Sequence, residues 1–368
     1  MFESATGGSA GDSSRLESTT CRSIEEIREN QLNNLVTQSE GGTLFHRYGW
    51  LAAVEEGLDV EPRHVTVRKG DNPVGFLPNF AADLPLPGEV GDRVADALPL
   101  EIVQPPPPGY GGPIVTSDKL EILARLFDPA ALTNGPRTVS HYVQTFDPDA
   151  VRYGRFLESL GYTPKITECT FVLDLDDDWE TVLENMDKGR RRGIRRALEQ
   201  DYEVEIRPFG DELNRTHDEY VSNIERVGGN RLPLRFFEAI AARIPERVRL
   251  FKAVVDGDEV GRYVYLLDDE SSVLHHWLSA IGDSDDFDRY PSELLHQRAI
   301  KWGMQEGYDR YSFGPVSPHF SNSVFRFKEK YGGTPVQLCR WERGTLPGAS
   351  TVYDLARTRY RRSQIDTE

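Results

Sequence analysis

The sequence has little cysteine, few lysines and no long apolar run, and each shortage excludes a class of protein or site. Its three cysteines, Cys21, Cys169 and Cys339, lie far apart without a C-x-x-C pair, so they indicate neither a disulfide framework nor a zinc site. No apolar run approaches the roughly 20 residues that span a bilayer, and the first residues lack the basic start and apolar centre of a signal peptide. We therefore expect a cytoplasmic protein without a membrane span.

Positive charge is also in short supply. The chain has 60 acidic and 43 basic residues and a formal net charge of −17. The acidic residues are spread over the whole chain and the basic ones are mostly arginine, a pattern typical of surfaces adapted to high salt, so we interpret the source as halophilic. A negative chain usually disfavours nucleic-acid partners, but high salt screens the charge, and the global balance decides little about the ligand.

The length and order of the segments predict two similar domains. At 368 residues the chain is long enough for both. Residues 1–22, rich in Ser, Gly, Thr and acidic residues, predict a disordered tail. "VTVRKGDNPVGFLP" in the first half and "KAVVDGDEVGRYVY" in the second share a strand, a Gly-Asp turn and a return strand. We predict two copies of one mixed α/β unit at residues 23–165 and 166–345, then a C-terminal tail or helix at 346–368.

Basic side chains gather in one predicted helix, "DKGRRRGIRRALEQD". Residues three and four apart share a helix face, so Lys188, Arg191, Arg192 and Arg195 form a cationic stripe. Guanidinium groups bind phosphate oxygens in bidentate fashion, which suits a nucleotide, a coenzyme A pyrophosphate or a tRNA backbone. The alternative is a solvated face balanced by acidic neighbours. We favour a binding role, because unbalanced like charges at this density cost stability.

The strand-like run "SSVLHHWLSA" holds a candidate proton acceptor. Successive strand residues point to opposite faces, so His275 and His276 diverge, and a metal site shared by both is not suggested. The unperturbed pKa of histidine lies near neutrality, which suits deprotonation of an amine nucleophile. We take His276, next to Trp277, as a candidate general base. The alternative is a packed, hydrogen-bonded structural histidine.

Two later segments carry further candidates. In "RYPSELL", Pro291 suits a helix start and Ser292 lies where backbone donors are free, which predicts an anion site or an ordinary helix cap. "SNSVFRFKEKYGG" gathers two lysines in a lysine-poor chain. Phe325 and Phe327 cannot share one helix face, and we predict that Lys328 faces a cleft. The glycine pair that follows predicts a left-handed helix end.

Three stretches resemble a known family. "YDRYSFG", preceded by "LLHQRAIKWGMQEG" and followed by "FRFKEKYGGTPVQL", resembles the C-terminal signature of the FemAB-like branch of the GNAT acyltransferase superfamily, which includes enzymes of peptidoglycan interpeptide bridges. "KGRRRGIRRALEQDYEVEI" is similar to the basic helix and strand of these proteins, and "YGGPIV" to the Tyr-Gly-Gly-Pro loop of their first domain. The matches cover much of residues 40–342.

The resemblance implies a fold and a set of binding residues. The fold class would be α/β (mixed α+β), with two tandem GNAT-like domains, each a twisted mixed sheet flanked by helices, and the active cleft mainly in the second. The residues that match the family by position, and would bind substrate or donor, are Tyr110, Gly111 and Gly112 in the first domain and Arg191, Arg195, Phe313, Gly314, Phe327 and Lys328 in the second.

The resemblance also implies transfer of an acyl or aminoacyl group to an amine by direct attack, without a tightly bound cofactor or metal. We favour acyl-coenzyme A as donor, with aminoacyl-tRNA as the alternative, and a small-molecule amine or amino sugar as acceptor. The chain lacks the Gln/Arg-x-x-Gly-x-Gly/Ala pyrophosphate loop of ordinary coenzyme A-binding members. The cationic stripe and Lys328 would bind phosphate or carboxylate, and His276 or Tyr263 would handle the proton. A third reading is a non-catalytic module that binds an anionic ligand. The oligomeric state stays open.

Overall fold

The computed structural model describes residues 15–84 and 100–346, apart from residues 118, 134, 147 and 148, and residues 348, 351, 353, 355 and 357–359 beyond them. Of the predicted tail, residues 1–14 lie outside the described residues. Leu16–Cys21 forms strand β1, so the prediction of disorder is wrong there. The reason is long-range pairing, because β1 lies antiparallel along a second strand from Leu16 opposite Lys69 to Cys21 opposite His64.

Strands of the described chain form two sheets. The small sheet has the order β1-β3-β4-β7, with β3 (His64–Lys69), β4 (Asn72–Leu77) and β7 (Ile114–Val115). The large sheet has 11 strands in the order β10-β11-β12-β13-β14-β9-β15-β8-β6-β5-β2. Its strands are β10 (Tyr202–Pro208), β11 (Val248–Val255), β12 (Asp258–Asp268), β13 (Val273–Ala280), β14 (Arg310–Ser312), β9 (Thr163–Asp174), β15 (Thr334–Gly344), β8 (Thr138–Thr145), β6 (Glu101–Gln104), β5 (Phe80–Asp83) and β2 (Glu61–Pro62).

Helices cover both sheets. The α-helices are α1 (Glu29–Gln38), α2 (Tyr48–Gly57), α4 (Leu120–Leu126), α5 (Pro129–Leu132), α6 (Asp149–Arg152), α7 (Gly154–Ser159), α8 (Trp179–Asn185), α9 (Lys188–Leu198), α10 (Leu213–Arg226), α11 (Leu234–Arg243), α12 (Pro291–Glu306) and α13 (Ser323–Glu329). Single turns of 3-10 helix are η1 (Ile24–Glu26), η2 (Leu44–His46), η3 (Gly135–Arg137), η4 (Pro245–Arg247) and η5 (Asp285–Arg289). Among the described helices, none is both long and apolar enough to cross a bilayer.

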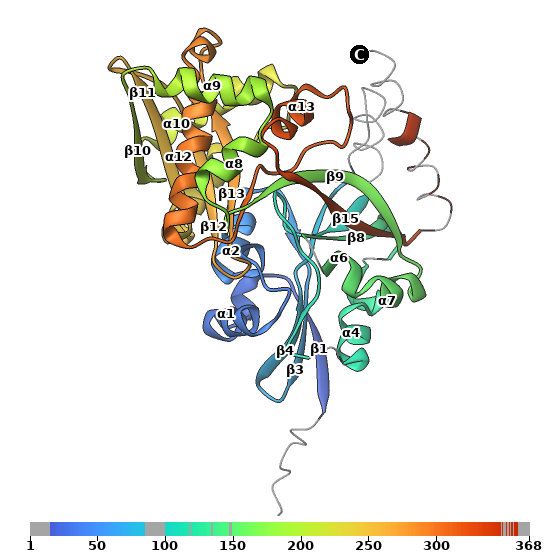
Figure 1. Ribbon diagram of the computed structural model, residues 1–368. Coiled ribbons are helices and arrows are strands. Elements are labelled where there is room, and N and C mark those ends of the chain that lie inside the picture. Colours follow the sequence, from blue (N-terminus) through green and yellow to red (C-terminus); the bar gives the residue numbers. More distant parts are fainter. Residues whose placement is uncertain are drawn as a thin grey trace, which may run out of the picture.

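The large sheet joins the two halves of the chain. β9 pairs with β14 of the C-terminal half and with β15, and β15 pairs with β8 of the N-terminal half. These two long strands cross the middle of the molecule in Figure 1. The proposed boundary between residues 165 and 166 falls inside β9, so any division of the chain there cuts a strand. The two hairpins read from the sequence are β3–β4 and β11–β12, both antiparallel.

Apolar side chains form a core in each half and a third between them. The N-terminal core includes Val65, Leu77 and Phe127, and the C-terminal core includes Phe251 and other residues of the large sheet. The core between the halves is aromatic: the ring of Trp50 on α2 lies 6.0 Å from that of Phe236 on α11 and 6.0 Å from that of Trp277 on β13. Since this core places β13 against the first half, residues of both halves meet beside it.

Candidate active site

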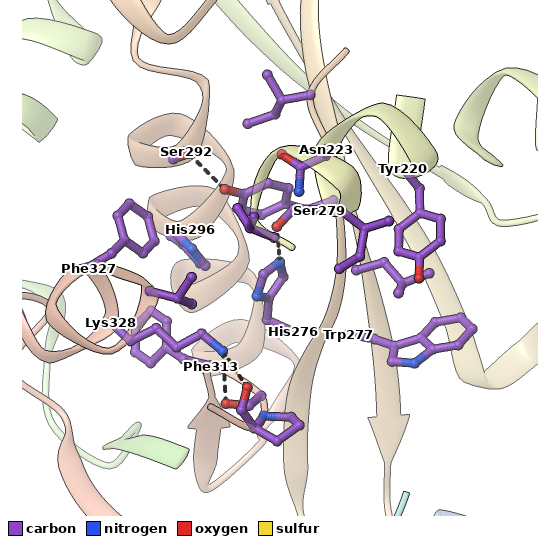
Figure 2. A pocket seen from close by; sticks show the side chains of 18 of the residues that line it. Tyr220, Asn223, His276, Trp277, Ser279, Ser292, His296, Phe313, Phe327 and Lys328 are labelled. Atoms are coloured by element: carbon purple, nitrogen blue, oxygen red, sulfur yellow. Dashed lines mark hydrogen bonds between the residues drawn. The ribbon is translucent and has the colours of Figure 1, made fainter. Parts of the chain in front are cut away.

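A cavity opens where two parallel strands part. β13 and β14 pair from Val273 opposite Arg310 to His275 opposite Ser312, and no further. Beyond the last pair, the chain from His276 and the chain from Phe313 line a cavity of about 470 Å³. α10, α12 and α13 supply most of the rest of the lining (Figure 2), and Tyr263 of β12 and Phe287 of η5 add to it. A gap between diverging strands exposes backbone groups that a bound ligand can use.

Gly314 shapes the floor of this cavity. Its φ of +75° lies in the left-handed region, which favours glycine. A Cβ atom at this position would lie 2.7 Å from the carbonyl oxygen of His276. Only glycine fits here, because any side chain would prevent the segments after β13 and β14 from approaching so closely. The turn aims the carbonyl groups of Gly314 and Pro315 at one point, where they receive a cation.

That cation is Lys328, which α13 carries into the cavity. Asn322 caps the helix by accepting a hydrogen bond of 2.9 Å from the Phe325 amide, and the Phe325 ring lies 5.0 Å from that of Phe171. With Phe325 turned to the sheet, Lys328 faces the cavity and donates to Gly314 O at 3.0 Å and Pro315 O at 3.1 Å (Figure 2). Among the described residues no carboxylate lies within ion-pair distance of it, and the charge of Glu168 acts on it only from further away.

Burial controls the charge of Lys328. Desolvation lowers its pKa from 10.5 to about 7, against a smaller opposing effect of Cys169 and Glu168. Near neutral pH the amine is therefore partly charged, and no carboxylate of the described residues forms an ion pair with it. An anion that enters the cavity, or a negative charge that develops there during a reaction, favours the charged form.

Tyr263 and His276 lie on neighbouring strands, with ring centres 4.5 Å apart. Tyr263 donates a hydrogen bond of 2.7 Å to Ser292 Oγ, and Ser279 Oγ lies 3.2 Å from His276 Nε2 (Figure 2). Burial lowers the pKa of His276 to about 3 and raises the pKa of Tyr263 to about 12. Both are neutral at pH 7, and His276 is a weak base, so their catalytic roles stay predictions.

His296 of α12 is a buried cavity residue that the sequence analysis passed over. Its Nδ1 lies 2.6 Å from the Tyr311 hydroxyl, and its Nε2 has no hydrogen-bond partner within the described chain. Burial lowers its pKa well below the usual range. The signal in the sequence was its spacing: His296 lies three and four residues before the buried Ala299 and Ile300 and four after Ser292, so it shares their inward face of the helix.

A second cavity of about 530 Å³ adjoins the first and reaches into the N-terminal half. The two share a wall, formed by Tyr220, Ile224, His276, Trp277, Leu278, Gly314 and Pro315. The rest of its lining includes the proline loop Pro105–Pro108, Tyr110 and Glu168, the last on β9. Burial raises the pKa of the Tyr110 phenol, and the charge of Glu168 adds to the effect. Glu168 was not among the residues predicted from the sequence.

The three residues predicted to bind substrate from the first-domain loop, Tyr110, Gly111 and Gly112, lie in two different surroundings. Tyr110 lines the second cavity, with its ring 5.0 Å from that of Phe45. Gly111 and Gly112 line neither large cavity. Gly111 pairs through its backbone with Gln144, and the carbonyl of Gly112 lies 3.1 Å from a ring nitrogen of His46. These two glycines hold the loop against neighbouring strands, and their predicted contact with substrate is not seen in these cavities.

The cationic stripe also lies away from the cavities. Lys188, Arg192 and Arg195 are exposed on α9, Arg191 donates to the Glu184 carbonyl, and all four are missing from both linings. The buried arginine of this helix is Arg190. It forms an ion pair with Glu293, and its guanidinium lies 4.5 Å from the Phe327 ring and 4.3 Å from that of Tyr331.

The start of α12 is an unfavourable place for a diphosphate. Four aspartates precede the helix: Asp283, Asp285, Asp286 and Asp288. Glu293 stands in its first turn and is already paired with Arg190. A helix N-terminus normally attracts anions, but these carboxylates oppose that attraction. Ser292, predicted as an anion-site residue, lines the first cavity and accepts a hydrogen bond from Tyr263 instead.

Eight predicted residues thus surround the first cavity, and Tyr110 lines the second. The eight are Tyr263, His276, Trp277, Ser292, Phe313, Gly314, Phe327 and Lys328. In the described part of the chain no group of three or more His, Cys, Asp or Glu side chains is placed to hold a metal ion. The first cavity can bind an acyl donor, and its partly charged lysine, which two carbonyl groups hold in place, can stabilise negative charge on the carbonyl oxygen of the donor.

Residues 185–329 match the model of the acetyltransferase (GNAT) domain. This segment is similar to GNAT acyltransferase domains, and the comparison with solved structures shows a tandem GNAT fold, as the sequence predicted.

Among its relatives is the UDP-N-acetylmuramoylpentapeptide-lysine N(6)-alanyltransferase of Weissella viridescens, 23% identical over 240 residues that cover 60% of this chain and 69% of the relative. The crystal structure of FemX matches with a TM-score of 0.66 at 14% identity, covering 89% of this chain and 98% of FemX. A tandem GNAT protein from the clavulanic acid biosynthesis pathway matches with a TM-score of 0.54 at 13% identity, covering 91% and 100%. The predicted likeness to the FemAB-like branch is thereby confirmed.

Proposed function

We propose that the protein transfers an aminoacyl group from an aminoacyl-tRNA to a primary amine. The observation that carries this proposal is Lys328, a buried lysine without a carboxylate partner in the described chain, held by two carbonyl groups at the point where β13 and β14 part. A charge left unpaired in this way is suited to stabilise an oxyanion that exists only during the reaction.

The two adjoining cavities suit two substrates. The donor carbonyl would lie in the first cavity beside Lys328, and the acceptor amine would enter through the second. Their shared wall at His276 and Gly314 is where the two would meet. Attack forms a bond between the amine nitrogen and the acyl carbon and breaks the ester bond. The nitrogen gives up one proton before attack and another as the leaving hydroxyl is released. Positioning of this kind supplies much of the rate in bimolecular transfers.

The electrostatics favour an RNA-linked donor over acyl-coenzyme A. The aspartates before α12 and Glu293 in its first turn repel a coenzyme A pyrophosphate there. The exposed cations of α9, including Lys188 and Arg192, lie on a helix whose start is bonded to the end of α13, from Asp187 N to Lys330 O at 3.0 Å. A phosphate backbone could contact this surface while its aminoacyl end enters the cavity. This reverses the order in which the sequence analysis ranked the two donors.

The acceptor is proposed to be an amine on a larger molecule. The name of the Weissella relative specifies the N6 atom of a lysine within a nucleotide-linked peptide. The second cavity, at about 530 Å³, accommodates an amine-bearing arm of such a molecule, and the body of the acceptor would stay outside. This differs from the small-molecule amine or amino sugar expected from the sequence.

The test compares donors with the full chain. Aminoacyl-tRNA, uncharged tRNA and acetyl-coenzyme A are added separately, the thermal midpoint is followed, and transfer of a labelled aminoacyl group to Nα-acetyl-lysine amide is measured. We expect binding and transfer with aminoacyl-tRNA, with an affinity that falls steeply as salt rises. Transfer from acetyl-coenzyme A alone would overturn the donor assignment.

Lys328→Met separates binding from chemistry. It removes the charge from the cavity and leaves the α9 surface intact, so we expect tRNA binding within about twofold of the native chain and a transfer rate lowered at least 100-fold. Lys330→Met, two residues further on and exposed, is the matched control and should transfer normally. Full activity of the Lys328 variant would refute the role of this lysine.

A further inference from the structure

The second cavity has an unusual balance of aromatic surface and charge. Its walls include the aromatic residues Phe45, Tyr110, Tyr220 and Trp277, drawn from both halves of the chain. Glu168 is the single carboxylate among the described lining residues, and neither lysine nor arginine appears there. Arg340 stacks on Tyr142 near this cavity, but it is bonded to a carboxylate of its own and is absent from the lining.

Glu168 keeps bonding capacity for a ligand. One carboxylate oxygen accepts a hydrogen bond of 2.7 Å from Gln144 Nε2, and the described residues offer it no ion-pair partner. Gln144 is itself fixed, because its backbone exchanges hydrogen bonds of 2.8 and 3.3 Å with Gly111. The carboxylate is therefore held in place by a neutral donor, and its second oxygen makes no hydrogen bond within the described chain.

The position of Glu168 links it to the reacting centre. Its neighbour Cys169 forms a backbone bridge with Val316, with N–O distances of 3.0 and 2.8 Å. Val316 directly follows Gly314 and Pro315, whose carbonyl groups hold Lys328. A group bound to Glu168 is thus next to the wall shared with the donor cavity.

We propose that this cavity binds the acceptor as an alkylammonium ion, with Glu168 as its anionic anchor and the aromatic rings around its alkyl chain. The inference rests on the proposed function and names the acceptor class for it. A half-buried carboxylate with aromatic rings attracts an ammonium group through charge and through the ring faces. A phosphate would find no cation among the described lining residues, so any phosphate of the acceptor lies outside this cavity.

The test needs no donor. Hexylamine, cadaverine and hexan-1-ol are titrated into the full native chain at one fixed salt concentration and followed by calorimetry. We expect both amines to bind at least tenfold more tightly than the alcohol, which has the same alkyl chain as hexylamine without the charge. Equal binding of hexylamine and hexan-1-ol would overturn the inference, and this comparison stands even if no variant folds.

A variant then locates the charge. Glu168→Gln keeps a hydrogen-bond acceptor for Gln144 and removes the anion, so we expect at least tenfold weaker hexylamine binding with hexanol binding unchanged. Glu203→Gln, which removes the same charge from an exposed site on β10, is the control and should bind as the native chain does. Unchanged amine affinity in the Glu168 variant would overturn the inference even if transfer from aminoacyl-tRNA is intact. Amine binding lost in this variant would support it even if the proposed donor proved wrong.

Discussion

Replacing Lys328 by methionine should make the protein more stable as well as less active. The pKa of the lysine falls from 10.5 to about 7, so holding its charged form in the native state costs about 5 kcal/mol, at about 1.4 kcal/mol for each pKa unit. Methionine has a similar length and no charge, and it removes this cost. It also leaves the carbonyls of Gly314 and Pro315 without their donor, which takes back about 1–3 kcal/mol.

The net expectation is a gain of about 2–4 kcal/mol near pH 7, or about 3–5 °C in Tm for a chain of this length. The sign follows from proton binding. Between pH 7 and 10.5 the unfolded lysine holds a proton that the native lysine has lost, so stability of the native chain rises with pH in that window. The advantage of the methionine variant is therefore full below pH 7 and shrinks as pH rises, and near pH 10.5 only the lost hydrogen bonds remain, so that the native chain is the more stable of the two.

The assay is thermal unfolding of the native chain, Lys328→Met and Lys330→Met at several pH values between 6 and 10. The exposed Lys330 should give a difference within about 0.5 kcal/mol at every pH. A gap between native chain and Lys328 variant that stays constant from pH 7 to pH 10 would refute the argument, because only a desolvated lysine produces that pH dependence. A variant less stable than the native chain at pH 7 would refute it as well.

Three further outcomes follow from the site. Gly314→Ala places a Cβ atom 2.7 Å from the His276 carbonyl at a φ of +75°, so we expect transfer to fall more than tenfold and circular dichroism to show a lower Tm. Arg190→Met leaves the partly buried Glu293 without its partner and should cost about 2–4 kcal/mol, measured by denaturant unfolding. Arg192→Glu should weaken tRNA binding and reduce the salt slope by at least about 1 in filter-binding assays, with the Tm unchanged.

Features that depend on residues close together in the sequence could be predicted from it. The segment after Asn322 indicated a short helix with its aromatic residues on different faces and Lys328 towards a cleft, and the structure has this arrangement. Gly332 ends the segment with a φ of +77°. Both depend on helix periodicity and on the backbone freedom of glycine, which act over a few residues.

Arg190 was not predicted from the sequence, because the charge count covered only one face of the basic helix and left out what the opposite face contacts; phosphate binding by the exposed stripe stays a prediction. Arg190 shares a helix face with Ile194 and Ala197, both buried, so its spacing already placed it inward. The predicted cationic stripe, with Lys188, Arg192 and Arg195, lies on the solvent-exposed side of the helix. Arg190 is the arginine through which α9 packs on the rest of the domain, because it forms an ion pair with Glu293 and lies over the ring of Phe327.

Glu168 could not be found from the sequence, because its significance comes from pairing between distant segments. It lies in "ITECTFVL", an ordinary strand pattern with one acidic residue. What gives it a role is the register of β9 against the chain after β14, where Cys169 bridges to Val316, 147 residues away. No local propensity specifies that register.

The same register fixes the relation between the two cavities. The backbones of Cys169 and Val316 are bonded to each other. Glu168 directly precedes Cys169, and Gly314 and Pro315 directly precede Val316. A continuous sheet resists sliding, because a shift of register breaks the hydrogen bonds of every pair along the strand. The acceptor anchor and the lysine are therefore held at a constant separation by backbone bonds. If the acceptor binds at Glu168 as proposed, we expect that binding of both substrates brings the amine and the donor carbonyl together without a closing motion of one half of the chain on the other.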